Sequence, residues 1–422
     1  MKRFLFFTLF LGLTCQFLSA QQSAQLFYKM GNEAYEGKKY KKYLQLMRQA
    51  DELLPNHPTI TEGLVRGYAL TGRKTRSIQH LRKLLMMDAT FEFQEDSDLK
   101  SIVGSRGYQG VVNLKRLLLN PEVNDELYRT IETDSLHVEG LVILDNGDLL
   151  LSSVHQKKIV RVDSAGNITD LLETPYSALG MKVDTHTGFL WVATAAMPEM
   201  LGFEEEDRGH SVIFQIDIES GNVKQAMSFE EEEMYGDLVL DSLSRIWLTN
   251  SQTPYLSRDN TEDVQSYGSF VRKQMDLSGT HFNLQGLTLN EDESALYFAD
   301  YQSGLYRMRV ADDHVDEVLA NSDFLLKGID GLYYYKNSLI AIKNGVKPNQ
   351  VVQYYLDEEG LNIIGRRVIN RGGAGLGEPT LGQIKEGYFY YIANSPWGAY
   401  NEDGRLQMEK VSPLQIRRFK LD

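Results

Sequence analysis

A short motif recurs six times from residue 139 onward, and each copy leads into an apolar strand, an acidic turn and a second apolar strand. We call it the start motif, and Glu139-Gly140-Leu141 is its first copy. The copies begin at residues 139, 179, 236, 285, 330 and 381, so successive copies are 40, 57, 49, 45 and 51 residues apart. Strand repeats of this length predict the blades of a β-propeller. We therefore expect a mainly β protein with a six-bladed β-propeller body, because a β-sandwich does not accommodate six in-phase copies.

A propeller closes its ring so that no sheet edge is left with unpaired backbone groups. Residues 128–131 can supply an outer strand beside the last apolar strand, residues 414–419. The propeller is then expected to span residues 128–422.

Apolar residues recur at helical spacing between residues 27 and 119. Phe27, Gly31 and Ala50 occupy the offsets of a tetratricopeptide repeat, and a looser copy follows after the 34-residue period of that repeat. The stretch resembles a pair of such repeats, which implies an α-helical arm over residues 21–122, with a helical cap around Leu99 to Leu119. Such an arm either offers a groove to a protein partner or packs on the next domain, and packing is the plainer interpretation.

The first twenty residues have the layout of a secretory signal peptide, with Lys2 and Arg3 before an apolar run and Ala20 at the expected cleavage site. The run is too short for a membrane span, and Cys15 lacks the small preceding residue typical of lipidation. Cleavage would remove the only cysteine and two cations, which changes the formal charge from −14 to −16. A disulfide-free exported chain fits a periplasmic or secreted protein of a bacterial envelope, without a membrane segment after processing.

The net charge of −14 opposes binding to nucleic acid phosphates and to anionic lipid headgroups. Two acidic clusters, residues 204–207 and 230–233, carry part of that charge. Such runs are usually solvated faces rather than cation-binding loops. We therefore expect no nucleic acid partner, and look for a small-molecule ligand in the propeller channel instead.

The innermost strand of each propeller blade begins near the central channel, so the six start motifs aim their side chains at one small volume. The residues concerned are Glu139, Leu179, Gly236 with Asp237, Gln285, Asp330 and Leu381. Carboxylates held close together repel one another unless a positive charge lies between them. Oxygen donors from several chain segments suit a hard cation, Ca²⁺ foremost and Mg²⁺ or Mn²⁺ less so.

Four of these motifs resemble those of the senescence-marker-protein and gluconolactonase family of six-bladed propellers, and the resemblance extends over most of residues 137–400. The four motifs are residues 138–141, 235–238, 284–287 and 329–332. The resemblance implies a secreted or cytosolic hydrolase of lactones and related esters, with one divalent cation held by a Glu, two Asn and an Asp.

By this resemblance, Glu139 matches the family's Glu, and Asp330 matches the Asp that also acts as acid and base. Asp237 matches an acidic neighbour of the first Asn. Gly236 and Gln285 stand where the two Asn are expected, and Gln285 still offers a carbonyl oxygen. The implied metal site is thus Glu139, Asp237, Gln285 and Asp330.

If the resemblance extends to activity, the cation polarises a carbonyl and lowers the pKa of a bound water, while Asp330 handles the proton. The alternative is a non-catalytic propeller that binds a ligand or a protein in the cell envelope, motivated by the two missing Asn. A zinc hydrolase is disfavoured because the histidines show no tight ligand spacing. The chain has no Gly-x-Ser-x-Gly motif, which argues against a serine hydrolase.

Further polar residues lie in or after strands of the blades, where they either line the channel mouth or cap turns: His155, Asn250, Asn344 and Asn394. Trp397 and Tyr400 lie in a loop of the sixth blade. They either wall the pocket or cover the propeller rim.

Overall fold

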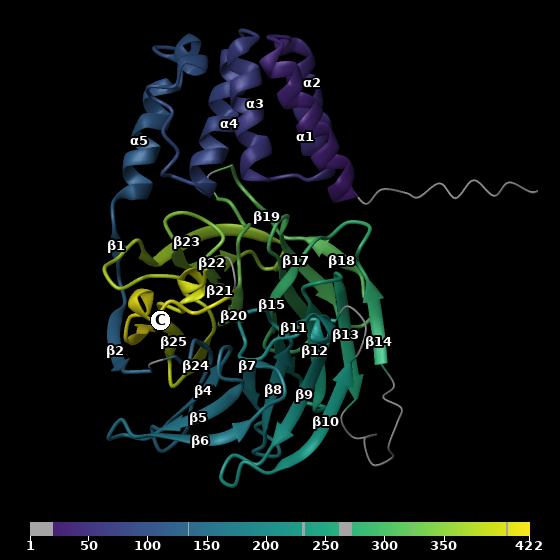
Figure 1. Cartoon of the computed structure of the whole chain (residues 1–422), viewed down its shortest axis with the longest axis vertical. Coiled ribbons are helices and arrows are strands. Elements are labelled where there is room, and N and C mark those ends of the chain that lie inside the picture. Colours follow the sequence, from purple (N-terminus) through teal and green to yellow (C-terminus); the bar gives the residue numbers. More distant parts are fainter. Residues whose placement is uncertain (1–19, 134, 230–232, 261–271, 323, 402–403) are drawn as a thin grey trace, which may run out of the picture. The chain divides into compact units, whose positions relative to one another are not determined.

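The computed structural model describes residues 20–422, apart from residues 134, 230–232, 261–271, 323 and 402–403 (Figure 1). The expected signal peptide and Cys15 therefore lie outside the described residues, except for Ala20, where the first helix begins. The chain divides into two compact units, one reaching to residue 80 with residues 94–105, the other containing residues 81–93 and 106–422. This division differs from the expected boundary at residue 122, because residues 81–93 and 106–122 group with the strand-rich unit.

Helices make up the first unit and the segment that leads into the second. They are α1 (Ala20–Glu36), α2 (Tyr40–Leu53), α3 (Pro58–Leu70), α4 (Lys74–Met87), the 3₁₀ helix η1 (Ser97–Ile102) and α5 (Tyr108–Leu119). The expected cap around residues 99–119 is thus two helices, separated where Gly104 and Gly107 adopt φ angles of +70° and +90°. Such angles favour glycine and interrupt a helix. Among the described residues, no helix is long and apolar enough to cross a membrane.

Glycines let the first helices approach one another closely. A methyl group placed on Gly31 would lie 2.3 Å from Cε of Met47, and one on Gly63 would lie 2.5 Å from Sδ of the same side chain. Met47 has no exposed surface, so it fills the space that the two glycines leave. Small residues at these positions are therefore a packing requirement of this unit.

Among the described residues, the second unit forms six antiparallel sheets arranged as the blades of a propeller, which confirms the predicted fold class (Figure 1). The first blade consists of β3 (Val138–Ile143), β4 (Leu149–Ser153), β5 (Lys158–Val162) and β6 (Ile168–Glu173). The second consists of β7 (Ser177–Val183), β8 (Leu190–Ala195), β9 (Ser211–Ile216) and β10 (Val223–Phe229). The third consists of β11 (Tyr235–Leu240), β12 (Arg245–Asn250), β13 (Tyr255–Asn260) and β14 (Arg272–Asp276).

The other three blades complete the ring. The fourth blade consists of β15 (Leu284–Leu289), β16 (Ala295–Asp300), β17 (Gly304–Arg309) and β18 (Val315–Glu317). The fifth consists of β20 (Gly331–Tyr334), β21 (Ser338–Lys343), β22 (Gln350–Leu356) and β23 (Asn362–Arg371), with β1 (Glu122–Val123) and β19 (Leu319–Ala320) beside β23. The sixth consists of β24 (Gly382–Lys385), β25 (Tyr388–Ile392), β26 (Leu414–Lys420) and β2 (Glu126–Ile131). Short 3₁₀ helices lie in loops: η2 (Glu205–Asp207), η4 (Trp397–Ala399) and η5 (Met408–Lys410).

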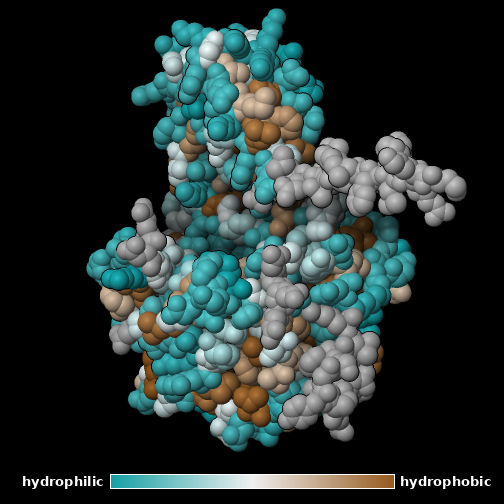
Figure 2. Space-filling view, turned by 45° about the vertical axis from the view of Figure 1, so that its right-hand side comes forward, coloured by the Kyte–Doolittle hydropathy of each residue, from teal (hydrophilic) through white to brown (hydrophobic). Residues whose placement is uncertain are grey.

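The core lies between neighbouring blades. Trp191 of the second blade packs in one cluster with Leu238 of the third, and Trp247 of the third packs with Leu287 of the fourth. Both indoles are almost completely buried. The face drawn in Figure 2 is mainly hydrophilic with scattered apolar patches, as expected for a strongly charged chain.

The start motif needs glycine because adjacent inner strands nearly touch. A methyl group placed on Gly140 would lie 2.4 Å from the backbone oxygen of Leu179, and one on Gly286 would lie 2.5 Å from that of Asp330. Real Cβ atoms do not come so close to backbone, so any larger residue would push the blades apart. Glycine therefore recurs in the start motif because the blades pack closely around the propeller axis.

The ring closes as the sequence predicts, with β2 pairing antiparallel to β26 and Arg129 opposite Ile416. Asp125, immediately before β2, accepts hydrogen bonds of 2.7 and 2.9 Å from the Arg417 guanidinium on β26. The Tyr391 hydroxyl and the Asn370 amide also donate to this carboxylate. The side chain of Asp125 has no exposed surface and that of Arg417 is 9% exposed.

We predict that Asp125→Ala lowers the free energy of unfolding by about 3–5 kcal/mol, because it leaves a buried guanidinium without its counter-charge. Urea denaturation of the whole protein measures this. The matched control is Glu126→Ala, which removes the neighbouring but exposed ion pair with Arg418 and should cost at most about 1 kcal/mol. Equal small losses in both variants would contradict a closure that depends on Asp125.

Candidate functional site

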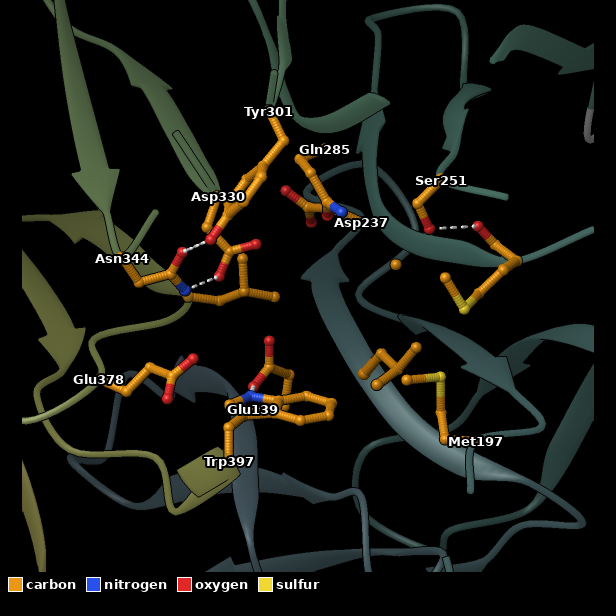
Figure 3. A pocket seen from close by; sticks show the side chains of 14 residues that line it. Glu139, Met197, Asp237, Ser251, Gln285, Tyr301, Asp330, Asn344, Glu378 and Trp397 are labelled. Carbon is orange, nitrogen blue, oxygen red and sulfur yellow. Dashed lines mark hydrogen bonds between the residues drawn. The ribbon is translucent and has the colours of Figure 1, made fainter. Parts of the chain in front are cut away.

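A cavity of about 180 Å³ lies where the six start motifs meet (Figure 3). It is lined by Glu139, Leu179, Met197, Met234, Gly236, Asp237, Ser251, Gln285, Tyr301, Asp330, Asn344, Glu378, Leu381 and Trp397. Every start motif contributes at least one residue to the lining, so these residues converge on one volume in the structure, as predicted. We call this cavity the central pocket.

β-bulges aim the start-motif side chains. In the first four blades the pairing of the innermost strand with the next strand shifts within the motif, between Val138 and Leu141 in the first blade and between Leu284 and Leu287 in the fourth. A bulge inserts an unpaired residue and redirects its side chain. Here it frees residues such as Glu139 from the ladder, so that they face the pocket.

Glu139 is held by an indole. Nε1 of Trp397 donates a 2.9 Å hydrogen bond to Oε2 of Glu139, and the Trp397 ring packs edge-on against His137, with 4.5 Å between ring centroids. Nδ1 of His137 lies 2.7 Å from the Tyr400 hydroxyl. Trp397 therefore walls the pocket, and Tyr400 supports it from outside through His137.

Asp330 is held by an amide. Nδ2 of Asn344 donates to Oδ2 of Asp330 over 2.7 Å and to the backbone oxygen of Pro379 over 3.1 Å. The Tyr301 hydroxyl donates to Oδ1 of Asn344 over 2.9 Å, so the amide has one orientation. Figure 3 shows the Asp330 carboxyl turned toward the space that Glu139 also faces.

Asp237 and Gly236 give the third blade a different arrangement. Oδ1 of Asp237 accepts from the backbone N–H of Leu238 over 2.9 Å, while Oδ2 is buried and has no hydrogen-bond donor in the described part of the chain. A methyl group on Gly236 would have only Oε1 of Gln285 near it, at 3.9 Å. The ring position that carries Glu139 in the first blade is thus open space in the third.

Glu378 is a pocket residue that the sequence did not single out. It lies after a glycine-rich run and three residues before the start motif of the sixth blade. Figure 3 shows its carboxyl directed into the pocket, between Asn344 and Trp397. The motif pattern marks the innermost strands only, so it carried no signal for a loop residue at this place.

Burial raises the pKa of all four pocket carboxyls, and repulsion by neighbouring carboxyls adds to it for Glu139 and Asp330. Burial, followed by the charge of Asp330, raises the pKa of Glu139 well above its usual range. Burial raises the pKa of Asp330 to about 7, although the Asn344 hydrogen bond acts in the opposite direction. Burial also raises the pKa of Asp237, against the attraction of Lys182, and that of Glu378.

Three other residues expected at the channel mouth are not among those that line the central pocket. Nδ1 of His155 lies 2.6 Å from the backbone oxygen of Glu199. Asn250 accepts from the backbone N–H groups of its own loop, such as that of Gln252, and Asn394 bridges the backbone of Pro413 and Gln415. Both asparagines hold loops, the role the sequence allowed as their alternative, whereas Asn344 does line the pocket.

Neither acidic run contributes a described residue to the lining of the central pocket. The first, at residues 204–207, forms the exposed start of η2, where Glu204 and Asp207 make a reciprocal capping box. Most of the second run, residues 230–232, lies outside the described residues.

No protein-family model and no curated protein matches the chain. Solved propellers do: an inactive virginiamycin B lyase from Staphylococcus aureus shares 11% identity over 72% of this chain and 100% of its own, at a TM-score of 0.46. A PQQ-bound aldose sugar dehydrogenase from Streptomyces coelicolor shares 14% identity over 71% and 99%, at a TM-score of 0.46. A gluconolactonase from Xanthomonas campestris shares 13% over 71% and 94%, also at 0.46. Likeness at this level carries no argument about reaction or ligand.

We predict that, without added divalent cation, the free energy of unfolding falls as the pH rises from about 4 to about 7. The raised pKa of Asp330 means that the folded protein keeps a proton which the unfolded chain releases near pH 4. Asp330→Asn should flatten this fall and stabilise the protein above pH 7. Urea midpoints at three pH values measure it, with the exposed Glu359→Gln as control. An unchanged slope in Asp330→Asn would refute the assignment.

Proposed function

We propose that the protein is a divalent-cation-dependent hydrolase of lactones or related esters, with the central pocket as its active site. One observation carries the proposal: four carboxyls face one small cavity, and no Lys or Arg is among the described residues that line it. Such a set is stable only with bound protons or a bound cation. Ca²⁺ is the ion that we expect, because all the donors are oxygens.

The donor chemistry fits a hard cation. Glu139 and Asp330 each use one carboxyl oxygen in a hydrogen bond, and Gln285 uses its amide nitrogen, donating to Asn283 over 2.6 Å. One oxygen of each side chain thereby stays available, as does the orphaned Oδ2 of Asp237. These four residues would hold the ion. Among the described residues no three His, Cys, Asp or Glu side chains form a preassembled ion cluster, so the carboxyls must rotate toward it.

A bound divalent cation would polarise a substrate carbonyl and make a water more acidic. The residues of the chain supply the rest. Asn344 holds the Asp330 carboxyl in place through Oδ2, and Asp330 is the residue that would take and return a proton. Leu179, Met234 and Leu381 line the pocket with apolar surface that limits access of bulk water.

A second candidate is a non-catalytic propeller that binds a ligand or a protein. Two observations favour it: the open space at Gly236 in place of an oxygen donor, and a separate cavity of about 270 Å³ in the helical unit, lined by Tyr28, Asn32 and Arg66 among others. That second cavity is where a protein partner of the arm would bind.

We propose a location outside the cytoplasm, periplasmic or secreted. Support comes from the signal-like residues 1–20 and from the absence of cysteine in the rest of the sequence. N-terminal sequencing of the protein recovered from an envelope fraction tests it, and an intact Met1 start would contradict it.

Ca²⁺ titration tests the metal site. We predict that Ca²⁺ raises the Tm of the wild-type protein by mass action, and that Glu139→Gln and Asp237→Asn weaken binding at least about tenfold by removing a charged ligand. Gly236→Asn should strengthen binding, because it adds an amide oxygen in open space. Gly236→Ala is its matched control and should not. Absence of any shift with Ca²⁺, Mg²⁺ and Mn²⁺ would refute metal dependence.

Turnover of a panel of lactones and aryl esters separates the two candidate functions. For the hydrolase we predict measurable turnover that falls at least about 100-fold in kcat in Asp330→Asn, because the proton acceptor is lost. The exposed Asp312→Asn serves as control. No turnover across the panel, with ligand binding retained, would favour the non-catalytic propeller.

A further inference from the structure

Glu378 lies outside the set of residues that would hold the ion, yet it faces the same cavity. In the described part of the chain its carboxyl has no hydrogen-bond donor, and burial raises its pKa, which means that the pocket does not stabilise its charge. Glu378 is half-buried, and a carboxylate that is partly removed from water without a partner is costly. Something that binds in the pocket is the natural partner of this group.

The backbone at Glu378 is fixed. The backbone N–H of Ser395 donates to the backbone oxygen of Glu378 over 2.9 Å, and the backbone N–H of Gly377 donates to the backbone oxygen of Ala393 over 2.9 Å. Asn344 holds the next residue, Pro379, by its backbone oxygen. The carboxyl is therefore presented by an ordered segment rather than by a free loop.

Trp397 is presented by the same pairing, because it follows Ser395 by two residues. Its N–H donates to Glu139 and its ring lies perpendicular to that of His137, so the orientation of the indole in the pocket wall is fixed. An indole face beside a carboxylate is the pair of groups that binds organic cations: the ring attracts the cation through its quadrupole, and the carboxylate attracts it through its charge.

The remaining pocket wall agrees with this ligand class. Met197, Met234 and Leu179 offer apolar surface to methyl or methylene groups. The buried Oδ2 of Asp237, which we assign to the ion, has no donor in the described chain, so the pocket keeps unpaired negative charge when no ion is bound; Asp237 has 4% of its surface exposed. In the ion-free pocket, anionic substrates meet four carboxyls and no Lys or Arg among the described lining residues, so they are disfavoured.

We propose that the central pocket recognises substrates that carry an ammonium group, primary or quaternary, with Glu378 and Trp397 as its binding residues. This inference deepens the proposed function, on which it rests, by naming the substrate class of the same site. Glu139, Asp237, Gln285 and Asp330 serve the ion and the reaction, while Glu378 and Trp397 select the ligand.

Choline and its neutral analogue 3,3-dimethylbutan-1-ol test the proposal, because they have the same shape and differ in charge. The chain has three tryptophans; Trp191 and Trp247 are buried in the blade core, so a ligand-induced change in fluorescence reports on Trp397. Titrations use the full chain, with Ca²⁺ and with a chelator, and calorimetry provides a second readout. We expect choline to bind at least tenfold more tightly than the alcohol.

Glu378→Gln should weaken choline binding at least tenfold and leave the alcohol unchanged. The control is Glu199→Gln, a half-buried carboxyl that is not among the lining residues; it should bind choline like the wild type. Equal affinity of wild-type protein for both probes overturns the proposal whether or not the variant folds. An unchanged affinity of folded Glu378→Gln for choline overturns it too.

The same titrations separate this proposal from the hydrolase proposal. Binding of Ca²⁺ without preference for choline means that the ligand class is wrong and the metal site stands. Preference for choline in the chelator, with no Ca²⁺ binding at any concentration, means that the ligand class is right and the metal dependence is wrong.

Discussion

A single buried carboxylate joins the two ends of the propeller, and the rest of the architecture depends on that junction. Asp125 precedes the first strand of the ring, and its partners Arg417, Tyr391 and Asn370 belong to the last two blades. Removing both charges from water costs several kcal/mol per ion unless each finds full compensation. Here the guanidinium, a hydroxyl and an amide all point at the same carboxylate. The start motifs meet in one cavity only when the ring is closed, so the geometry of the central pocket depends on this junction, whose residues do not line the pocket.

Closure also creates the electrostatics of the pocket. The inner strands approach so closely that glycine is required beside the axis, as at Gly140 and Gly286. Side chains one residue earlier in the motif then share a small volume, and two of them, Glu139 and Asp330, are acids. Burial raises their pKa values together with mutual repulsion. The packing that builds the fold therefore brings these carboxyls together, and a bound cation or bound protons would relieve their repulsion.

The propeller could be predicted from the sequence because the start motif recurs periodically and because a propeller must close its ring. The pairing of β2 with β26 and the convergence of the six start motifs both follow from these two facts. The sequence did not predict that Glu378 lines the pocket, because the position of this residue depends on a backbone pairing with Ser395 across a loop. Asn250 and Asn394 show the converse. A polar residue in or after a strand either faces the channel or binds its own loop, and only the path of that loop decides. Helix periodicity likewise does not tell which neighbour a helix packs against, and residues 81–93 and 106–122 group with the strand-rich unit.

The third blade explains why the pocket is asymmetric. In the five other blades glycine holds the second position of the start motif, whereas here Gly236 holds the first and Asp237 the second. The second position faces the neighbouring blade, and a methyl group on Gly180 would lie 2.8 Å from Oδ1 of Asp237. The carboxyl thus occupies room that Gly180 provides, and the first position is left as free volume. The third blade lies opposite the sixth in a six-membered ring, so this volume is across the pocket from the loop that carries Glu378. A ligand whose ammonium group met Glu378, as we propose, would therefore have unfilled space for its other end across the pocket at Gly236.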